Sequence, residues 1–191
     1  MRKGLLVVIS GPSGVGKGTV IRQLLKKDES ICLSVSCTTR PPRPGEIDGV
    51  HYAFVTKEKF LEMIEAGEFL EYMPVFANYY GTPLKMVQEK REQGKDVILE
   101  IDVKGALAVK QKVRDAVMIF IMPPSKEELK RRLVGRGTES EDQLSRRVAE
   151  AEVEMEKNVE YDHIVVNRQV SQAVKEIQQI IDKEHREREG K

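Results

Sequence analysis

The stretch that decides the fold is Gly11-Pro12-Ser13-Gly14-Val15-Gly16-Lys17. It follows the apolar run Leu5–Ile9 and precedes Val20–Leu25, which has the pattern of a helix. A strand, a glycine-rich loop and a helix in this order form the context that a phosphate-binding loop requires. Glycines let successive backbone N–H groups curve around an anion, and the helix N-terminus and Lys17 add positive charge. The stretch therefore predicts binding of a nucleoside triphosphate and outweighs the alternative of an ordinary glycine-rich turn.

One position departs from the common form of this loop, in which a hydroxyl residue follows the lysine and binds Mg²⁺. Here Gly18 follows Lys17, and the hydroxyl comes one residue later, at Thr19. Mg²⁺ keeps several waters and often takes few protein ligands. We therefore expect Mg²⁺ to be held mainly through substrate phosphates and water, with Thr19 or Asp102 as candidate protein ligands.

The composition fits one globular domain, because the chain has 191 residues, of which 40% are hydrophobic and 33% are charged. The net charge of +1 provides no overall field that would attract nucleic acid or a membrane. Cys32 and Cys37 have neither a metal-knuckle nor a redox spacing, the histidines are isolated, and no zinc site is expected. No apolar run suits a secretory signal or a membrane span. We expect a cytoplasmic protein, either a monomer or a weak homo-oligomer.

Short apolar runs alternate with helical patterns over most of the chain, which predicts an α/β fold with right-handed crossovers. The apolar runs predict buried strands of a parallel sheet at Leu5–Ser10, Val97–Asp102, Val117–Met122 and Ile164–Val166. The periodic segments predict helices at Lys17–Lys27, Val103–Val113, Ser125–Val134 and Ser171–Glu189. A capping box, Ser125-Lys126-Glu127-Glu128, supports the start of the third helix.

The stretch from Ile31 to about Val87 breaks this alternation. It predicts a small, partly antiparallel insertion built from Leu33–Cys37, His51–Val55, Glu68–Met73 and a helix at Lys57–Ala66 that Thr56 starts. Most of the aromatic residues of the chain fall in this stretch. They form a small core or, because several carry hydroxyl groups, line a ligand pocket.

Two arginine clusters are candidates for phosphate contacts. Arg131–Arg147 is polar and holds Arg136 between two glycines, which predicts a mobile flap between two helices. Phosphoryl transfer depends on positioning and charge neutralisation, so Arg132, Arg136 and Arg147 are candidate catalytic groups together with Lys17. The alternative for each arginine is a solvated helix face. In the second cluster, Arg40–Glu46, prolines hold two guanidinium groups at a fixed spacing, which suits a second phosphate.

A resemblance covers nearly the whole chain. Ser34–Glu46 closely resembles the signature of guanylate kinases. The resemblance continues in order through Gly49–Val55, Gly67–Glu71, Asn78–Thr82, Ile98–Gly105 and Leu133–Glu139. These motifs are more specific than the phosphate-binding loop alone. The Gly18-Thr19 pair departs from the serine-bearing loop of many members, which puts the metal ligand in doubt and leaves the activity unaffected.

The resemblance implies a fold, a division of the chain and a reaction. The fold is a P-loop NTPase-type parallel sheet flanked by helices, with a small mixed α/β GMP-binding insertion and a helical lid. The expected division is a core (1–32, 88–128 and 160–191), a GMP-binding region (33–87) and a lid (129–159). The reaction is transfer of the γ-phosphoryl group from ATP to GMP with Mg²⁺. The substrates are small molecules, and no nucleic acid or membrane takes part.

The resemblance also implies residue roles. The residues implied for the ATP phosphates and nucleoside are Gly11, Pro12, Ser13, Gly14, Val15, Gly16, Lys17, Gly18, Thr19 and, more weakly, Asn167. The residues implied for GMP are Ser36, Arg40, Arg43, Glu46, Tyr52, Glu71, Tyr80, Thr82 and Asp102. Guanine offers two adjacent donors and one acceptor, so a carboxylate such as Glu71 can accept from both donors while hydroxyls of Ser36 and Thr82 donate to O6. Adenine has an acceptor at N1 and a donor at its six-position amine, so it matches neither the carboxylate nor the hydroxyls.

Asp102 is expected to end a buried strand at the carboxyl edge of the sheet, where ligands bind in such folds. Glu100 and Asp102 alternate with apolar residues and should therefore project from the same face. Which of the two reaches the base or a metal-bound water stays open. Two other functions are alternatives to a nucleotide kinase. One is a catalytically silent interaction module of the same fold, and the other is a P-loop kinase for a sugar phosphate. The intact loop with its arginines argues against the first, and Glu71 with Ser36 argues against the second.

Overall fold

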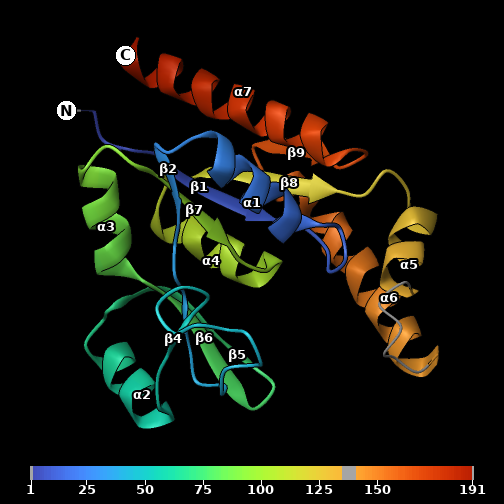
Figure 1. Cartoon of the computed structure of the whole chain (residues 1–191), viewed down its shortest axis with the longest axis horizontal. Coiled ribbons are helices and arrows are strands. Elements are labelled where there is room, and N and C mark those ends of the chain that lie inside the picture. Colours follow the sequence, from blue (N-terminus) through green and yellow to red (C-terminus); the bar gives the residue numbers. More distant parts are fainter. Residues whose placement is uncertain (1, 135–140, 191) are drawn as a thin grey trace.

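The computed structural model describes residues 2–134 and 141–190. Its larger sheet has five parallel strands in the order β2-β7-β1-β8-β9 (Figure 1). These strands are β1 (Leu6–Ser10), β2 (Ile31–Leu33), β7 (Asp96–Glu100), β8 (Val117–Met122) and β9 (His163–Val166). The middle strand, β1, is buried along its whole length because it pairs on both sides, with β7 and with β8.

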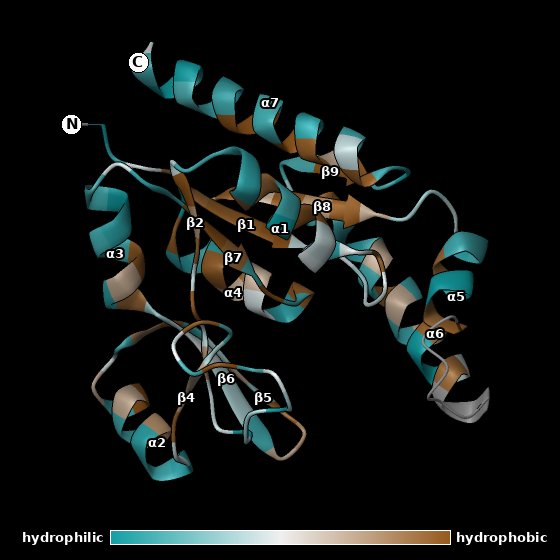
Figure 2. Ribbon diagram, in the orientation of Figure 1, coloured by the Kyte–Doolittle hydropathy of each residue, from teal (hydrophilic) through white to brown (hydrophobic). Residues whose placement is uncertain are grey.

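Helices cover both faces of this sheet, and alternate residues of β1 supply the two cores. Leu5, Val7 and Ile9 pack with α1 (Lys17–Lys27) and α7 (Val170–Glu189). Leu6 and Val8 pack with α3 (Leu84–Glu92) and α4 (Val103–Lys112). The apolar colour is concentrated on the strands, and the helices are hydrophilic on their outer faces (Figure 2). Burial on both faces explains why the strands read as continuous apolar runs.

A smaller sheet lies beside the carboxyl end of the larger one, with the strand order β4-β3-β6-β5 (Figure 1). It consists of β3 (Cys37–Thr38), β4 (Ala53–Phe54), β5 (Phe69–Val75) and β6 (Asn78–Pro83), joined by α2 (Lys57–Glu65). Thr56 caps α2 by accepting a hydrogen bond from the Lys59 backbone N–H. Phe60 stacks on Phe69 with ring centroids 4.4 Å apart, which gives this part a core of its own.

The remaining part is a helical hairpin, formed by α5 (Lys126–Val134) and α6 (Glu141–Glu156), and a short 3₁₀ helix follows at Lys157–Glu160. Leu129 and Leu133 of α5 pack against Ala151 and Met155 of α6. The predicted flap over Arg131–Arg147 is therefore wrong in extent, since Arg131 and Arg132 belong to α5 and Arg146 and Arg147 belong to α6. Both ends of that polar stretch are helical because α5 and α6 share this small core.

Most predicted elements are confirmed within one or two residues, and Lys17–Lys27 and Val117–Met122 are confirmed at both ends. The predicted strand Val97–Asp102 is wrong at its end, because β7 stops at Glu100 and Asp102 caps α4. The predicted piece Leu33–Cys37 is wrong, because β2 ends at Leu33 and β3 begins only at Cys37; helix α3 and strand β6 were not predicted. The expected division of the chain cuts four elements: β2 between residues 32 and 33, α3 between residues 87 and 88, α5 between residues 128 and 129, and the short 3₁₀ helix between residues 159 and 160. Among the described residues, no helix is long and apolar enough to cross a membrane.

Candidate active site

The glycine-rich loop between β1 and α1 has a left-handed backbone at Gly11, Gly14 and Gly16, and two of these glycines lie against the ends of the sheet. Gly16 has φ 96°, and a Cβ there would lie 2.8 Å from Nδ2 of Asn167. Gly11 has φ 145°, and a Cβ there would lie 2.3 Å from the carbonyl oxygen of Ile121. The left-handed backbone and the close neighbours both exclude a side chain. These two glycines therefore set the loop against the ends of β8 and β9.

Lys17, the first residue of α1, folds back over this loop. Its Nζ donates to the carbonyl oxygen of Gly11 at 2.5 Å and to that of Pro12 at 3.3 Å. The Lys17 side chain also lines a cavity of about 350 Å³ together with Gly11 and Ser13. A cation at the rim of a curved backbone beside the N-terminus of α1 is the arrangement that binds phosphate.

Asn167 and Arg132 hold the outer side of the loop. Nδ2 of Asn167, which follows β9, donates to the Val15 carbonyl oxygen at 2.8 Å. Arg132 donates to the same oxygen at 3.1 Å, to the Asn167 carbonyl oxygen at 3.2 Å and to Glu128 at 2.8 Å. Both side chains thus contact the loop backbone directly and help to hold the loop in place. This role is additional to the nucleotide contacts expected for them.

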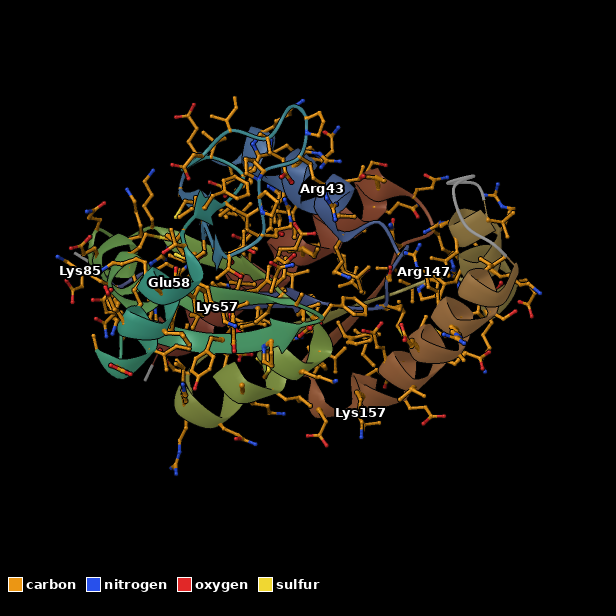
Figure 3. All side chains as sticks on the ribbon, turned by 90° about the horizontal axis from the view of Figure 1, so that it is seen from below. Arg43, Lys57, Glu58, Lys85, Arg147 and Lys157 are labelled. Carbon is orange, nitrogen blue, oxygen red and sulfur yellow. The ribbon has the colours of Figure 1, made fainter. Side chains whose placement is uncertain are left out.

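The hairpin of α5 and α6 reaches the loop at a second point, Ser13. Arg147 donates to Oγ of Ser13 at 2.7 Å, and Glu154 accepts from the backbone N–H of Ser13 at 3.3 Å. Figure 3 shows Arg147 on the side of α6 that faces the rest of the molecule. Arg136, the third expected arginine of this part, lies outside the described residues.

A second cavity, of about 220 Å³, lies between the small sheet and the end of β7. Glu71 of β5 lines it and is buried, and its Oε1 accepts a hydrogen bond from Oγ1 of Thr82 at 2.7 Å. Burial raises the pKa of Glu71, the Thr82 hydrogen bond opposes this shift, and the nearby Asp102 adds to it. Thr82 itself is buried behind Glu71, so its hydroxyl orients the carboxylate. Ser36 supplies a hydroxyl to the same cavity.

Two carboxylates at the end of β7 connect the cavities. Glu100 and Asp102 line both of them, together with Ser36, Tyr52 and Ile101. Asp102 also accepts from the Gly105 backbone N–H at 2.7 Å as the cap of α4. Burial raises the pKa of Glu100, while the charges of Lys17 and Arg22 lower it. The cavity at the glycine-rich loop and the cavity at Glu71 are therefore adjacent.

The proline-rich loop presents Arg40 in a fixed position. Two nitrogens of Arg40 donate to the two carboxylate oxygens of Glu46, at 2.6 and 2.7 Å. The Arg40 guanidinium also lies 5.1 Å from the ring centroid of Tyr52, and Tyr52 meets Tyr80 edge-on with centroids 5.9 Å apart. The pKa of Glu46 falls to about 2, because it accepts from Arg40 and from the Arg43 backbone N–H. The observed contacts of Glu46 make it the partner of Arg40, and its expected role in GMP binding stays a prediction.

Glu154 is the residue that sequence reasoning missed. It lines the same cavity as Lys17 and Glu100 and binds the backbone of the loop. Its position could have been found from its spacing to Arg147. Two helical turns separate the two residues, which places them on one face of a continuous helix.

A parallel sheet with a glycine-rich loop between β1 and α1, and with a lysine at the helix start, defines a P-loop nucleotide-binding protein. The guanylate kinase family model matches residues 3–184, and the chain belongs to this family. It is 52% identical to a guanylate kinase of Clostridioides difficile, over 96% of this chain and 90% of that protein. It is 51% identical to a guanylate kinase of Halalkalibacterium halodurans, over 98% of this chain and 92% of that protein. The crystal structure of guanylate kinase from Anaplasma phagocytophilum superposes with a TM-score of 0.78 at 37% identity, over 96% of this chain and 87% of that chain.

Proposed function

We propose that this protein transfers the γ-phosphoryl group of ATP to GMP, giving ADP and GDP. The observation that carries the proposal is the pair of adjacent cavities, with a buried carboxylate, Glu71, at one end and the glycine-rich loop with Lys17 at the other. One end suits a base with adjacent donors, and the other suits a triphosphate. Membership of the guanylate kinase family supports the same reaction.

Guanine would be read by the carboxylates and the hydroxyl of the smaller cavity. Glu71 accepts from the guanine N1–H and N2 amine, and Ser36 donates to O6. Thr82 already donates to Glu71, so it holds the carboxylate in place for this contact. Asp102 lines the same cavity and offers a further acceptor. A base that leaves a buried carboxylate unpaired binds much more weakly, which explains discrimination against adenine.

The phosphates would be held from two sides. Arg40 and Arg43, with the hydroxyls of Tyr52 and Tyr80, bind the phosphate of GMP. On the other side Lys17 and the loop N–H groups bind the triphosphate. Arg132, Arg136 and Arg147 neutralise charge on the transferring group when the hairpin closes. The acceptor is already an anionic phosphate at neutral pH, so no strong general base is needed.

The donor atoms of the site fit Mg²⁺. Carboxylate oxygens of Glu100 and Asp102 line the cavity that contains Lys17, and hard oxygen ligands are those that Mg²⁺ prefers. Within the described residues, no three acidic, histidine or cysteine side chains converge closely enough to hold a metal by themselves. We propose that substrate phosphates and water provide most ligands, and that Asp102 is better placed than Thr19, which is exposed and hydrogen-bonded to Arg22. Bound Mg²⁺ would neutralise charge on the β- and γ-phosphates.

The test is ADP release measured separately with GMP, AMP, CMP and UMP as acceptors. Release should require an acceptor and should be fastest with GMP. Lys17→Ala should lower kcat at least about a hundredfold, because it removes a charge aimed at the transferring group. Lys27→Ala, at the exposed far end of α1, serves as the matched control and should leave kcat unchanged. Equal rates with all four acceptors, or ADP release without any acceptor, would contradict the proposal.

A further inference from the structure

One carboxylate of the lid hairpin lies where an anionic ligand would be expected. Glu154 of α6 accepts a hydrogen bond from the Ser13 backbone N–H, at 3.3 Å, in the middle of the glycine-rich loop. It also lines the cavity of about 350 Å³ that contains Lys17. The loop N–H groups and Lys17 are the groups that attract phosphate oxygens in such loops. A glutamate carboxylate presents two oxygens with a negative charge and can use the same donors.

The surroundings of Glu154 raise the pKa of its carboxyl group overall. Burial raises the pKa of Glu154, and the Lys17 charge and the Ser13 hydrogen bond lower it. Asp102 and Glu150 repel its negative charge, and Glu100 lines the same cavity. The Lys17 charge and the Ser13 N–H therefore partly offset the cost of placing this carboxylate in an acidic, partly buried site. Arg147, two helical turns earlier, holds the same face of α6 against Oγ of Ser13.

We propose that Glu154 competes with the triphosphate for the phosphate-binding loop. In the free enzyme its carboxylate occupies part of the anion site, and it must be displaced when the triphosphate binds. This inference rests on the proposed function, because it assumes that the loop binds ATP. Its consequence is that binding of the nucleotide breaks one of the two contacts between α6 and Ser13. The lid hairpin is thereby released for its closed position only when phosphate has arrived. A ligand that binds only after such a contact opens has its apparent affinity reduced by the fraction of enzyme in the open form.

The test is the dissociation constant of ADP, measured by calorimetry without divalent ions and with EDTA present, so that any contact of Glu154 with a metal does not contribute. Glu154→Gln should bind ADP roughly three- to tenfold more tightly than the wild type, since the charge that competes is gone. Glu154→Asp keeps the charge but shortens the side chain. It should tighten ADP binding as well, because it breaks the direct contact with the Ser13 N–H. Glu156→Gln changes the net charge equally at an exposed position of α6, and it should bind ADP as the wild type does.

The outcomes separate this inference from the proposed function. If wild-type protein and Glu156→Gln bind ADP but Glu154→Gln binds it equally or more weakly, the competitor role is overturned and the function stands. If the wild type shows no ADP binding at all while it is folded, the proposed function fails first. GMP binding provides an internal control, because Glu154→Gln should change the dissociation constant of GMP by less than about twofold. A larger change there would mean that the substitution disturbs the whole site and would also overturn the inference.

Discussion

Glu71 is buried and accepts hydrogen bonds from Thr82. Its exposed fraction is 5%, and Oγ1 of Thr82 holds one carboxylate oxygen. The Glu71 side chain also lines the cavity to which Ser36 and Asp102 contribute. A buried acceptor of this kind gains most from a ligand with adjacent donors and loses most when a ligand brings an acceptor instead.

Glu71→Gln should therefore change the choice of base. The substitution keeps the size but places an amide donor where a carboxylate oxygen faced a guanine donor. The ratio of kcat/KM for GMP over AMP should fall by more than about tenfold, which exceeds the loss of one neutral hydrogen bond. Glu68→Gln, three residues earlier and exposed, should leave the ratio unchanged. A ratio within a factor of about three of the wild-type value would assign guanine reading to Asp102 instead.

Phe76, at the tip of the β5–β6 hairpin, has an unfavourable backbone and an unfavourable environment. Among the described residues it is the one non-glycine residue with positive φ, at 54°, and its side chain is fully exposed. A side chain in the left-handed region costs about 1–2 kcal/mol. Phe76→Gly should thus raise the free energy of unfolding by about 1 kcal/mol after the extra chain entropy of glycine is subtracted.

Chemical denaturation of the two hairpin variants tests this prediction. Ala77→Gly is the matched control, because Ala77 has an ordinary negative φ and glycine there should lower the denaturation midpoint or leave it unchanged. A lower midpoint for Phe76→Gly than for the wild type would show that the phenyl ring makes a stabilising contact that outweighs its strained backbone.

At the scale of elements, the proline-rich loop behaves as a rigid support for Arg40. Glu46 binds Arg40 through both oxygens and also accepts from the Arg43 backbone. Glu46→Gln should raise the KM for GMP by about tenfold, the equivalent of one charge-assisted hydrogen bond, and leave the KM for ATP unchanged. Steady-state kinetics with each substrate varied in turn measures both values, and Glu58→Gln on the exposed side of α2 is the control. An equal rise for both substrates would contradict a local role.

The ion pair between Arg40 and Glu46 should persist at acidic pH. The pKa of Glu46 is lowered from 4.5 to about 2, mainly by Arg40. A carboxyl group with a lowered pKa in the folded state contributes stability above its unfolded pKa and loses it as the pH falls through the folded value. The Arg40–Glu46 contact should therefore remain at pH 4 and be lost only toward pH 2. An NMR titration of the Glu46 carboxyl carbon would show this, and a midpoint near 4.5 would contradict it.

The sequence predicted elements where one strong pattern acts alone. The apolar run Val117–Met122 and the loop–helix junction at Lys17 were located correctly because burial and glycine chemistry leave few alternatives. Helix α3 was missed because it is largely polar and follows Pro83 directly, so neither an apolar stripe nor a polar cap marks its start. Glu154 was missed for a different reason: its spacing to Arg147 places both residues on one face of a helix, but the sequence does not show that this face packs against the glycine-rich loop.

At the scale of the molecule, a buried pair ties the last helix to the base of the larger sheet. His185 of α7 lies 2.8 Å from one oxygen of Asp96, and the other oxygen accepts from the Leu5 backbone N–H at 2.7 Å. His185→Ala should lower the free energy of unfolding by about 1–3 kcal/mol, because it leaves a buried carboxylate oxygen without its partner. Arg186→Ala, at the exposed next position, should change it by less than about 0.5 kcal/mol. Denaturation midpoints compare the two, and equal midpoints would contradict the prediction.

The position of β1 in the middle of the larger sheet has a consequence for synthesis of the chain. Leu6 pairs with Val97 on one side, and Val7 pairs with Val117 on the other. At about 5–20 residues per second on the ribosome, the first strand waits roughly 5–20 s for its first partner. During that time its apolar side chains can be covered only by α1, late in this interval by α3, or by a chaperone. The central strand of the sheet is therefore made first, but its pairing is completed late. Nascent chains that stop before β7 should be prone to aggregate.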